Sequence, residues 1–525
     1  MFDYIIVGAG SAGCVLAARL TEDPHISVLL LEAGSPDQKQ EIHIPAAWPK
    51  LFKSNFDWAY FTEEQPQLNH RRLYWPRGKT LGGSSSMNAM IYMRGHQHDY
   101  DRWRELGNDG WGWPDVLPYF IRSEHQERGA SKLHGTGGPL NVADLRCTNP
   151  VSQAFVAACG EYGLPRNDDF NGPEMEGAGF FQVTQKNGKR CSAAVAYLRP
   201  ARPRPNLTIK TGALLARLLF DGTRATGAEY VQDGKLLQVR AEREVILSGG
   251  AVNSPQSLML SGIGPADELK ALGIPVVADL PGVGRNLQDH LIGAAQYECT
   301  QPVTMASAER LGNVVNYLLF RQGPLSSNVA EAGAFLKTRA AAPAPDIELI
   351  FAPTFYMGHG FDNPAGHGFA IGAILQHPVS RGCLRLRSAD PTAPPLIQPN
   401  YLAAEADQAA LIEGTQLARS IAGASSLDAF RGRELWPGPA NRSDEAVGQF
   451  LRGTAETLYH PVGSCKMGSD AMAVVDERLR VHGVAGLRVV DASIMPEIIT
   501  GHTGAPVMMI AEKAAEMIRQ ESCQP

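Results

Sequence analysis

Near its N-terminus the chain reads Tyr4-Ile5-Ile6-Val7-Gly8-Ala9-Gly10-Ser11-Ala12-Gly13, an apolar run followed by a glycine-rich turn. The GxGxxG spacing predicts a strand, a tight turn and a helix over residues 11–20. The first glycine would form the turn, the second would let a diphosphate approach the backbone, and the third would allow close helix–strand packing. The helix N-terminus would offer unpaired N–H groups to the diphosphate. The residues we expect at this contact are Gly8, Ala9, Gly10, Ser11, Ala12 and Gly13.

A carboxylate closes the next predicted strand, which covers residues 27–31. This residue, Glu32, follows Gly13 by 19 positions, where a carboxylate can accept hydrogen bonds from ribose hydroxyls and disfavours a 2′-phosphate. We expect Glu32 and the adjacent Ala33 to bind the ribose end of a dinucleotide. The alternative is a glycine-rich turn beside a surface glutamate. The motif does not distinguish FAD from NAD.

Composition excludes several classes of protein. The 525 residues carry 48 Lys+Arg against 54 Asp+Glu, a net charge of −6, with 44% hydrophobic and 19% charged residues. These values exclude bulk disorder and give no basic footprint for nucleic acid. No apolar run reaches the roughly 18 residues of a membrane span, the first residues lack a basic leader, and no HExxH or Cys/His cluster suggests a metal. We therefore expect a cytoplasmic protein; peripheral membrane contact and a homo-oligomer remain open.

Many glycines and prolines, 54 and 36, divide the chain into short elements. Alternation over residues 383–387 indicates an antiparallel sheet with one solvated face. The fold class predicted is α/β plus α+β, in which a doubly wound Rossmann-type domain is interleaved with a domain built on an antiparallel sheet. We expect further strands at 206–211, 244–248 and 487–490, a helix capped by Asp99 that runs to Leu106, and a helix from Pro506 to Arg519.

Three later segments carry a family resemblance. The first is Arg77-Gly78-Lys79-Thr80-Leu81-Gly82-Gly83-Ser84-Ser85-Ser86-Met87-Asn88, and the second runs from Gly250-Ala251-Val252-Asn253-Ser254-Pro255 to Gly264-Pro265. The third comprises Tyr459-His460-Pro461-Val462-Gly463, Val489-Val490-Asp491-Ala492-Ser493 and Gly501-His502-Thr503-Gly504. Together with the N-terminal motif they resemble the glucose-methanol-choline (GMC) oxidoreductases, which bind FAD and oxidise alcohols. The resemblance extends from Tyr4 to about Ile518 and is nearest to the choline dehydrogenase and alcohol dehydrogenase-like branch.

The resemblance implies FAD as the cofactor and gives roles to residues of these motifs. In the family, the asparagine at the place of Asn88 lies beside the N5/C4a edge of the flavin. Some members carry a covalently linked histidine just before it, where this chain has Met87, so we expect FAD without a covalent link. Leu215 aligns with a residue whose backbone contacts adenine. The remaining expected contacts are Arg77, Gly82, Gly83, Ser84, Ala89, Gly250, Asp491, Ala492, His502 and Thr503.

Oxidation of an alcohol on flavin needs a base for the hydroxyl proton and hydride transfer from the α-carbon to N5. His460 matches the catalytic base of the family, and His502 matches the second position of its catalytic pair. We expect His460 to take the proton while His502 hydrogen-bonds the forming alkoxide, although the sequence does not separate their roles. The expected partners are a small primary alcohol and an electron acceptor. That acceptor is a quinone or a similar compound, with O₂ as the alternative.

Two other functions remain as alternatives. The same fold hosts hydroxynitrile lyases, which keep the flavin without using its redox chemistry, and a non-catalytic FAD-binding protein is the third possibility. The expected organisation has residues 1–295 mainly in the FAD domain, with a substrate-domain insertion near 151–190. Residues 296–444 would form the substrate domain, and residues 445–525 would return to the FAD domain with the histidine pair. Residues expected to line the substrate route are Trp58, Tyr60, Phe355 and Tyr459, whereas Glu331 would face the site or end a strand.

Overall fold

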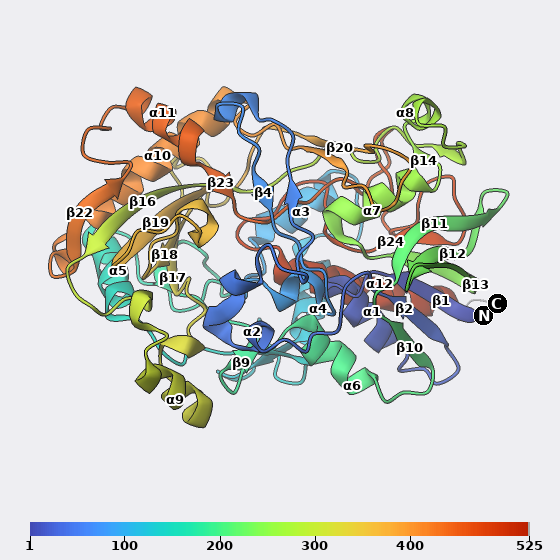
Figure 1. The fold of residues 1–525 in the computed structure, drawn as a ribbon, viewed down its shortest axis with the longest axis horizontal. Coiled ribbons are helices and arrows are strands. Elements are labelled where there is room, and N and C mark those ends of the chain that lie inside the picture. Colours follow the sequence, from blue (N-terminus) through green and yellow to red (C-terminus); the bar gives the residue numbers. More distant parts are fainter. Residues whose placement is uncertain (523–525) are drawn as a thin grey trace.

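The computed structural model of the chain describes residues 1–522 and contains two seven-stranded sheets. The sheets lie toward opposite ends of the long axis of the molecule, and the N-terminus lies beside the first sheet (Figure 1). Segments far apart in sequence contribute to each sheet, so the two halves are interleaved. The predicted fold class is confirmed.

The first sheet has the order β10-β2-β1-β13-β12-β11, and β24 also pairs with β13. The pairs among β10, β2, β1, β13 and β24 are parallel, whereas β11 and β12 extend the sheet as an antiparallel meander. Strands such as Val28–Leu31 are entirely apolar because both of their faces are buried. The bounds are β1 (Phe2–Val7), β2 (Val28–Leu31), β10 (Leu207–Lys210), β11 (Leu214–Asp221), β12 (Arg224–Gln232), β13 (Lys235–Leu247) and β24 (Leu487–Val489).

Two helices far apart in sequence, α1 (Ser11–Leu20) and α12 (Gly504–Ser522), pack against each other beside this sheet. Helix α4 (Trp113–Ser123) covers the other side of α12. The bounds of α1 agree with the sequence prediction. The helix expected from Pro506 instead begins at Gly504, so the proline occupies the third helical position.

Helix α3 (Gln97–Glu105) corrects a second predicted boundary. Its N-cap is His96, whose ring nitrogen Nδ1 accepts from the backbone N–H of His98 at 3.1 Å. Asp99 lies one turn inside the helix and accepts from the His96 backbone N–H, completing a capping box. The same carboxylate also accepts from the backbone N–H of Thr500 at 2.8 Å. Asp99 therefore ties the start of α3 to the segment that precedes α12.

The second sheet is antiparallel throughout, with the order β22-β16-β19-β18-β17-β7 and with β23 paired to β16. Helices α5 (Pro150–Glu161) and α10 (Glu405–Ala422) pack on one face. Side chains alternate along the strands, so Phe351 and Phe369 enter the core under these helices while Ile350 and Ala370 face a cavity. The bounds are β7 (Gly177–Phe180), β16 (Leu291–Cys299), β17 (Ala332–Leu336), β18 (Ile347–Ala352), β19 (Gly368–Leu375), β22 (Arg431–Trp436) and β23 (Glu456–Thr457).

Shorter elements connect the two sheets. The predicted alternation at residues 383–387 forms β20, which pairs with β21 as a separate antiparallel ribbon. Among residues 1–522, no helix has the length and apolar character needed to cross a bilayer. The other elements are β3 (Tyr60–Phe61), β4 (Tyr74–Trp75), β5 (Glu124–Gln126), β6 (Leu140–Val142), β8 (Gln185–Lys186), β9 (Lys189–Arg190), β14 (Ile263–Gly264), β15 (Ala278–Asp279), β20 (Cys383–Arg385), β21 (Leu396–Gln398), α2 (Gln40–His43), α6 (Arg199–Ala201), α7 (Gly250–Leu260), α8 (Ala266–Ala271), α9 (Leu311–Phe320) and α11 (Asp444–Thr454).

Candidate active site

A long cavity begins where the carboxyl ends of β1, β2 and β13 meet and continues to the inner face of the second sheet. β2 and β10 lie on one side of β1, and β13 and β24 lie on the other. The strand order therefore changes direction at β1, and ligands of open α/β sheets bind at such points. Gly8, Glu32 and Ser248 follow the three strands and line the cavity.

Two glycine-rich loops form one end of this cavity. The backbone N–H of Gly82 donates to the carbonyl of Ala9 at 2.7 Å. A Cβ atom on Gly83 would lie 2.7 Å from the Gly10 Cα, and Gly83 has φ +52°. Bare backbone from both loops therefore forms a narrow cradle next to the N-terminus of α1, which lacks a side-chain cap. A diphosphate fits this arrangement because backbone N–H groups and a helix N-terminus face it.

Glu32 is buried at the edge of the cradle. One carboxylate oxygen accepts from the backbone N–H of Ala9 and the other from that of Gly34, both at 2.8 Å. Burial raises the pKa of this carboxyl to about 7, against which the two hydrogen bonds act. Each oxygen keeps a further lone pair, so the residue can still accept from a ribose hydroxyl.

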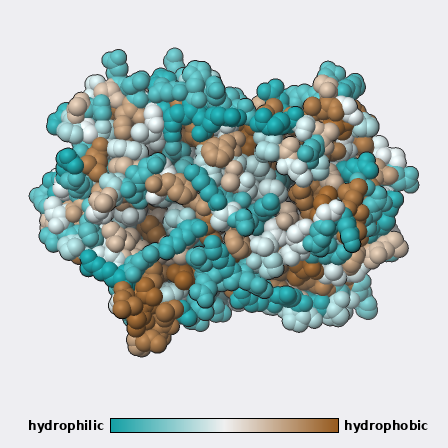
Figure 2. Space-filling model, viewed as in Figure 1, coloured by the Kyte–Doolittle hydropathy of each residue, from teal (hydrophilic) through white to brown (hydrophobic). Residues whose placement is uncertain are grey.

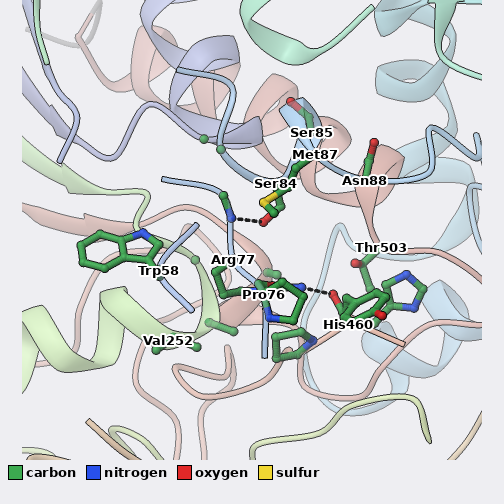
Figure 3. A pocket seen from close by; sticks show the side chains of 18 of the residues that line it. Trp58, Pro76, Arg77, Ser84, Ser85, Met87, Asn88, Val252, His460 and Thr503 are labelled. Atoms are coloured by element: carbon green, nitrogen blue, oxygen red, sulfur yellow. Dashed lines mark hydrogen bonds between the residues drawn. The ribbon is translucent and has the colours of Figure 1, made fainter. Parts of the chain in front are cut away.

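The structure brings nearly all of the predicted contacts to this one cavity, part of which is seen in Figure 3. Three residues do not reach its wall. Ala9 and Gly82 are hydrogen-bonded to each other and join the two loops, and a Cβ on Gly13 would lie 1.9 Å from the Gly8 carbonyl oxygen, so Gly13 lets α1 pack closely on the first turn. The other predicted site residues all line the cavity, namely Gly8, Gly10, Ser11, Ala12, Glu32, Ala33, Arg77, Gly83, Ser84, Asn88, Ala89, Leu215, Gly250, Asp491, Ala492, His460, His502 and Thr503.

Asn88 has a fixed orientation in the cavity wall. Its side-chain oxygen accepts from Nη1 of Arg190 at 2.8 Å and from the backbone N–H of Met90 at 3.1 Å. The amide nitrogen therefore faces the start of α12, where a Cβ on Gly504 would lie 3.7 Å from it. Sequence reasoning missed Arg190, a buried cation that forms no ion pair within residues 1–522 and whose pKa burial lowers to about 9.

Asp491 has more protein contacts than the sequence indicated. Its carboxylate accepts from the backbone N–H of Gly250, the hydroxyl of Ser254 and the backbone N–H of Ser493. These bonds attach the start of α7 to the segment after β24. Asp491 therefore helps to shape the cavity wall as well as facing it.

His460 and His502 lie side by side in the cavity wall (Figure 3 shows His460 beside Thr503). Their ring centroids are 4.9 Å apart and their planes are nearly perpendicular, at 85°. Burial and the neighbouring imidazoles of His502 and His290 hold the pKa of His460 well below its ordinary value. His460 is therefore neutral at pH 7, as a base must be.

His290 fixes the tautomer of His460 and was missed in the sequence. Its Nε2 lies 3.0 Å from the carbonyl oxygen of Gln376, which can only accept, so Nε2 carries a hydrogen. Burial lowers the pKa of His290 to about 3, so this ring is neutral and its Nδ1 is an acceptor. Nδ1 of His460 lies 3.0 Å away and must donate to it. The remaining ring nitrogen of His460, Nε2, then keeps a free lone pair.

Glu348 is the second partner that the sequence did not reveal. Its carboxylate is fully buried in β18 and lies 2.9 Å from Nε2 of His502. Since a carboxylate accepts, Nε2 of His502 carries a hydrogen, and its Nδ1 is the remaining polar atom of the ring. In the sequence, Glu348 could have been found as the single carboxylate within the apolar segment 347–352.

Four residues of the cavity wall that carry side chains have positive φ. Met90, Val329, His359 and Tyr459 have φ of +59°, +74°, +60° and +70°, and all four line the cavity. Positive φ is unusual for side-chain-bearing residues and a marked outlier for a β-branched valine. Such conformations gather at functional sites, where the surrounding structure maintains them.

The remaining sequence candidates divide between the cavity and the core. Trp58 and Tyr459 line the cavity, whereas Tyr60 and Phe355 do not. Glu331 is buried just before β17 and accepts from Asn149, Ser152 and Ser327. Glu331 therefore ends a loop at the strand and does not line the cavity.

Comparisons with known proteins agree with this geometry. Family models described as GMC oxidoreductase match residues 2–292 and 378–511. The mitochondrial choline dehydrogenase of Mus musculus is 46% identical over 532 residues, covering 99% of this chain and 89% of that protein. The alcohol dehydrogenase (acceptor) of Pseudomonas putida is 48% identical over 527 residues, covering 99% and 96%.

Solved structures show the same fold. The crystal structure of pyridoxine 4-oxidase from Mesorbium loti superposes with a TM-score of 0.91 at 36% identity, covering 99% of both chains. The structure of formate oxidase gives a TM-score of 0.92 at 30% identity, covering 99% of this chain and 98% of that one. The chain is a member of the GMC oxidoreductase family.

Proposed function

We propose that the protein oxidises a primary alcohol to an aldehyde with FAD and passes the electrons to a quinone or a similar acceptor. The observation that carries the proposal is the contact of His460 Nδ1 with His290, which leaves Nε2 of His460 as the free ring nitrogen in a cavity continuous with the dinucleotide cradle. A fixed base close to a cofactor site is the arrangement that removal of a hydroxyl proton requires. The family membership supports FAD and an alcohol substrate.

Different groups of residues in the cavity wall suit the different parts of FAD. When bound, FAD would accept a hydride from the alcohol carbon. The cradle of Gly10 and Gly83 would hold the diphosphate, and Glu32 with Ala33 would bind the ribose. Leu215 would lie at the adenine, and Asn88 with the N-terminus of α12 would face the flavin ring.

The two histidines would have different tasks. His460 would take the hydroxyl proton on Nε2, since its Nδ1 already donates to His290. His502 would act through Nδ1, because Nε2 is bonded to Glu348. A proton on that Nδ1 would make it a donor to the developing alkoxide, with the buried carboxylate balancing the charge.

Relatives support two kinds of acceptor. The Pseudomonas putida protein is named for an unspecified acceptor, and an oxygen-dependent choline dehydrogenase of Paraburkholderia phymatum is 47% identical over 529 residues. We propose a quinone-type acceptor first and O₂ as the alternative.

The test is a panel of alcohols mixed with the holoenzyme without oxygen. Choline, benzyl alcohol and a medium-chain alkanol should be compared by loss of the oxidised flavin absorbance, and at least one should bleach it. Turnover in air against turnover with a soluble quinone then separates the two acceptors. A flavin that no alcohol bleaches, in a protein that cleaves cyanohydrins, would identify a lyase instead.

The cofactor should be held without a covalent bond. Met87 lies in the cavity wall next to Asn88, and its thioether offers no ring nitrogen for a flavin linkage. Acid precipitation of the holoenzyme should therefore release all yellow colour into the supernatant. A yellow pellet after washing would show a covalent link.

We retain the domain division as a proposal with two adjustments. β7 joins the second sheet, in keeping with an insertion near 151–190. β16 begins at Leu291 and β23 covers Glu456–Thr457, and both also belong to that sheet. These strands favour boundaries near 290 and 458 in place of 295 and 445.

A further inference from the structure

Helix α9 carries an apolar stripe that faces solvent. Five of its ten residues are large apolar side chains with exposed fractions between 45% and 79%, namely Leu311, Val315, Leu318, Leu319 and Phe320. Residues 311, 315 and 318 or 319 recur at the spacing of one helix face. Figure 2 shows the stripe as a hydrophobic knob at the lower edge, at the position of α9 in Figure 1. An exposed apolar helix face of this kind usually marks a surface that contacts another protein or a membrane.

The other face of α9 is anchored to the protein. Tyr317 is buried and donates from its hydroxyl to the carbonyl of Gly188, at the tip of the β8–β9 hairpin, at 2.9 Å. Arg146 donates from Nε to the carbonyl of Arg321, the C-cap of the helix, at 3.1 Å. The exposed stripe is therefore the outer side of a fixed element and faces away from the protein core.

Basic side chains lie around the apolar stripe of α9. Arg310 is the N-cap of α9 and Arg321 its C-cap, and Lys186 and Lys189 flank the hairpin tip under Tyr317. Within residues 1–522, none of these four side chains nor Arg146 forms an ion pair with a carboxylate. The chain as a whole has a net charge of −6, so this unpaired positive cluster is a local feature.

We propose that α9 is a membrane-contact helix that inserts its apolar stripe into the interface of an anionic lipid bilayer. An amphipathic helix with apolar residues on one side and Lys/Arg at its boundary lies in the headgroup region in this way. The five cations would contact anionic headgroups as the apolar side chains enter the acyl region. The proposal does not depend on the reaction that the protein catalyses.

A second copy of the chain fits the surface less well. A two-fold interface brings the same patch of both molecules together, so the five cations of one copy would face those of the other. Like charges at close range oppose such an interface, whereas anionic lipid headgroups neutralise them.

Vesicle sedimentation tests the proposal. The holoenzyme should pellet with vesicles of phosphatidylcholine plus phosphatidylglycerol, less with phosphatidylcholine alone, and less again as salt is raised. L318S/L319S should lower the partition coefficient at least about tenfold, since two apolar side chains no longer enter the bilayer. K186Q/K189Q should weaken binding only to the anionic vesicles.

Matched controls remove equivalent groups elsewhere. L236S/V379S removes two apolar side chains of similar exposure, and K132Q/K235Q removes two exposed lysines. Both should bind vesicles as the unaltered protein does, and all variants should keep its thermal unfolding midpoint. Protein that stays in the supernatant with anionic vesicles overturns the proposal, as does undiminished binding by L318S/L319S. A dimer in sedimentation velocity that L318S/L319S dissociates would assign the surface to a second copy.

Discussion

The chemistry of His460 depends on a neighbour that is 170 positions away in sequence. Nδ1–H of His460 donates to Nδ1 of His290, and the carbonyl of Gln376 holds His290 in the matching tautomer. An orienting partner of a catalytic imidazole acts by keeping the reactive nitrogen unprotonated and correctly aimed. His290 is therefore a positioning residue, since it does not line the cavity itself.

Substitution of His290 tests this role. H290A should slow anaerobic flavin bleaching by a saturating alcohol, because His460 can then adopt the tautomer with hydrogen on Nε2. The substrate dissociation constant should change little. H290N should recover part of the rate, because its amide oxygen can accept from Nδ1 of His460. Equal rates in H290A and unaltered protein, or equal losses in both variants, would contradict the assignment.

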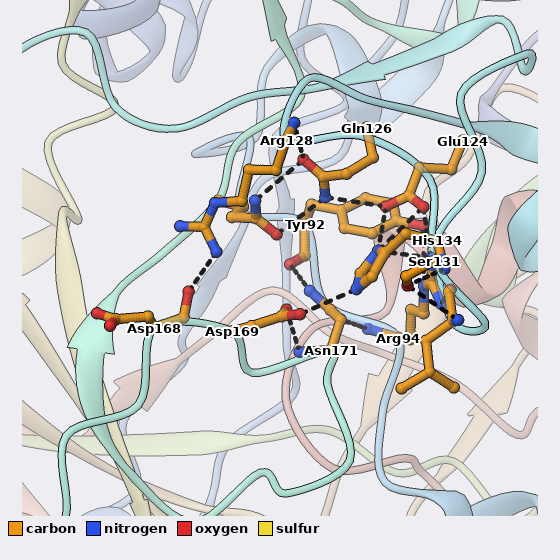
Figure 4. A network of polar contacts seen from close by, with 12 residues as sticks. Tyr92, Arg94, Glu124, Gln126, Arg128, Ser131, His134, Asp168, Asp169 and Asn171 are labelled. Carbon is orange, nitrogen blue, oxygen red and sulfur yellow. Dashed lines mark hydrogen bonds and ion pairs between the residues drawn. The ribbon is translucent and has the colours of Figure 1, made fainter.

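At the scale of elements, buried charges attach distant segments to one another. Glu512 of α12 is fully buried and accepts from Arg19 of α1, Arg122 of α4 and the hydroxyl of Tyr197. A second network joins Glu124 of β5, Arg94, His134 and Asp169 (Figure 4). The first network joins α1, α4 and α12, and the first residues of α1 and α12 lie in the cavity wall.

Loss of the Glu512 carboxylate should be strongly destabilising. E512A leaves two arginines facing a buried void, which typically costs about 3–5 kcal/mol of unfolding free energy. E516A removes a carboxylate from the same helix, but Glu516 is partly exposed, so a loss of only about 0–1 kcal/mol is expected. Urea unfolding of both variants measures the contrast. Similar losses of unfolding free energy in the two variants would show that the burial of Glu512 does not determine its contribution to stability.

Because of the His134 network, the free energy of unfolding should fall as the pH rises into the alkaline range. Hydrogen bonds to Asp169 and Glu124 raise the pKa of His134 to about 9, above its ordinary 6.5. A raised pKa in the folded state means that the contribution is complete below pH 6.5 and is lost as pH rises through about 9. The pKa rises by about 2.5 units, so at about 1.4 kcal/mol per unit the contribution is at most about 3.5 kcal/mol.

Urea unfolding of H134Q at pH 6.5 and pH 10 measures this contribution. The variant should be less stable than the unaltered protein at pH 6.5, and the difference should shrink by pH 10. H70Q, at a largely exposed histidine, serves as the control and should differ little at either pH. A difference that stays constant or grows between the two pH values would contradict the prediction.

For the whole molecule, local patterns predicted the fold while contacts between distant segments stayed hidden. The glycines of residues 8–13 need a particular backbone, so their spacing identifies the strand–turn–helix unit directly. His460 and His502 were found because each lies within a motif. His290, Glu348 and Arg190 act only through partners brought near by folding. No motif contains them, and only Glu348 stands out locally, as a single carboxylate in the apolar segment 347–352. Pro506 misplaced the start of α12 because proline is tolerated throughout a first helical turn.

The arrangement of two interleaved sheets places the histidine pair and the dinucleotide cradle in the same cavity, and the proposed mechanism depends on this. The direct test is anaerobic stopped-flow reduction of the bound flavin by an alcohol substrate, in unaltered protein and in H460A with equal flavin content. The absence of the base should slow bleaching roughly 10²–10⁴-fold. Bleaching by H460A at the rate of the unaltered protein would contradict the role of His460 as the base.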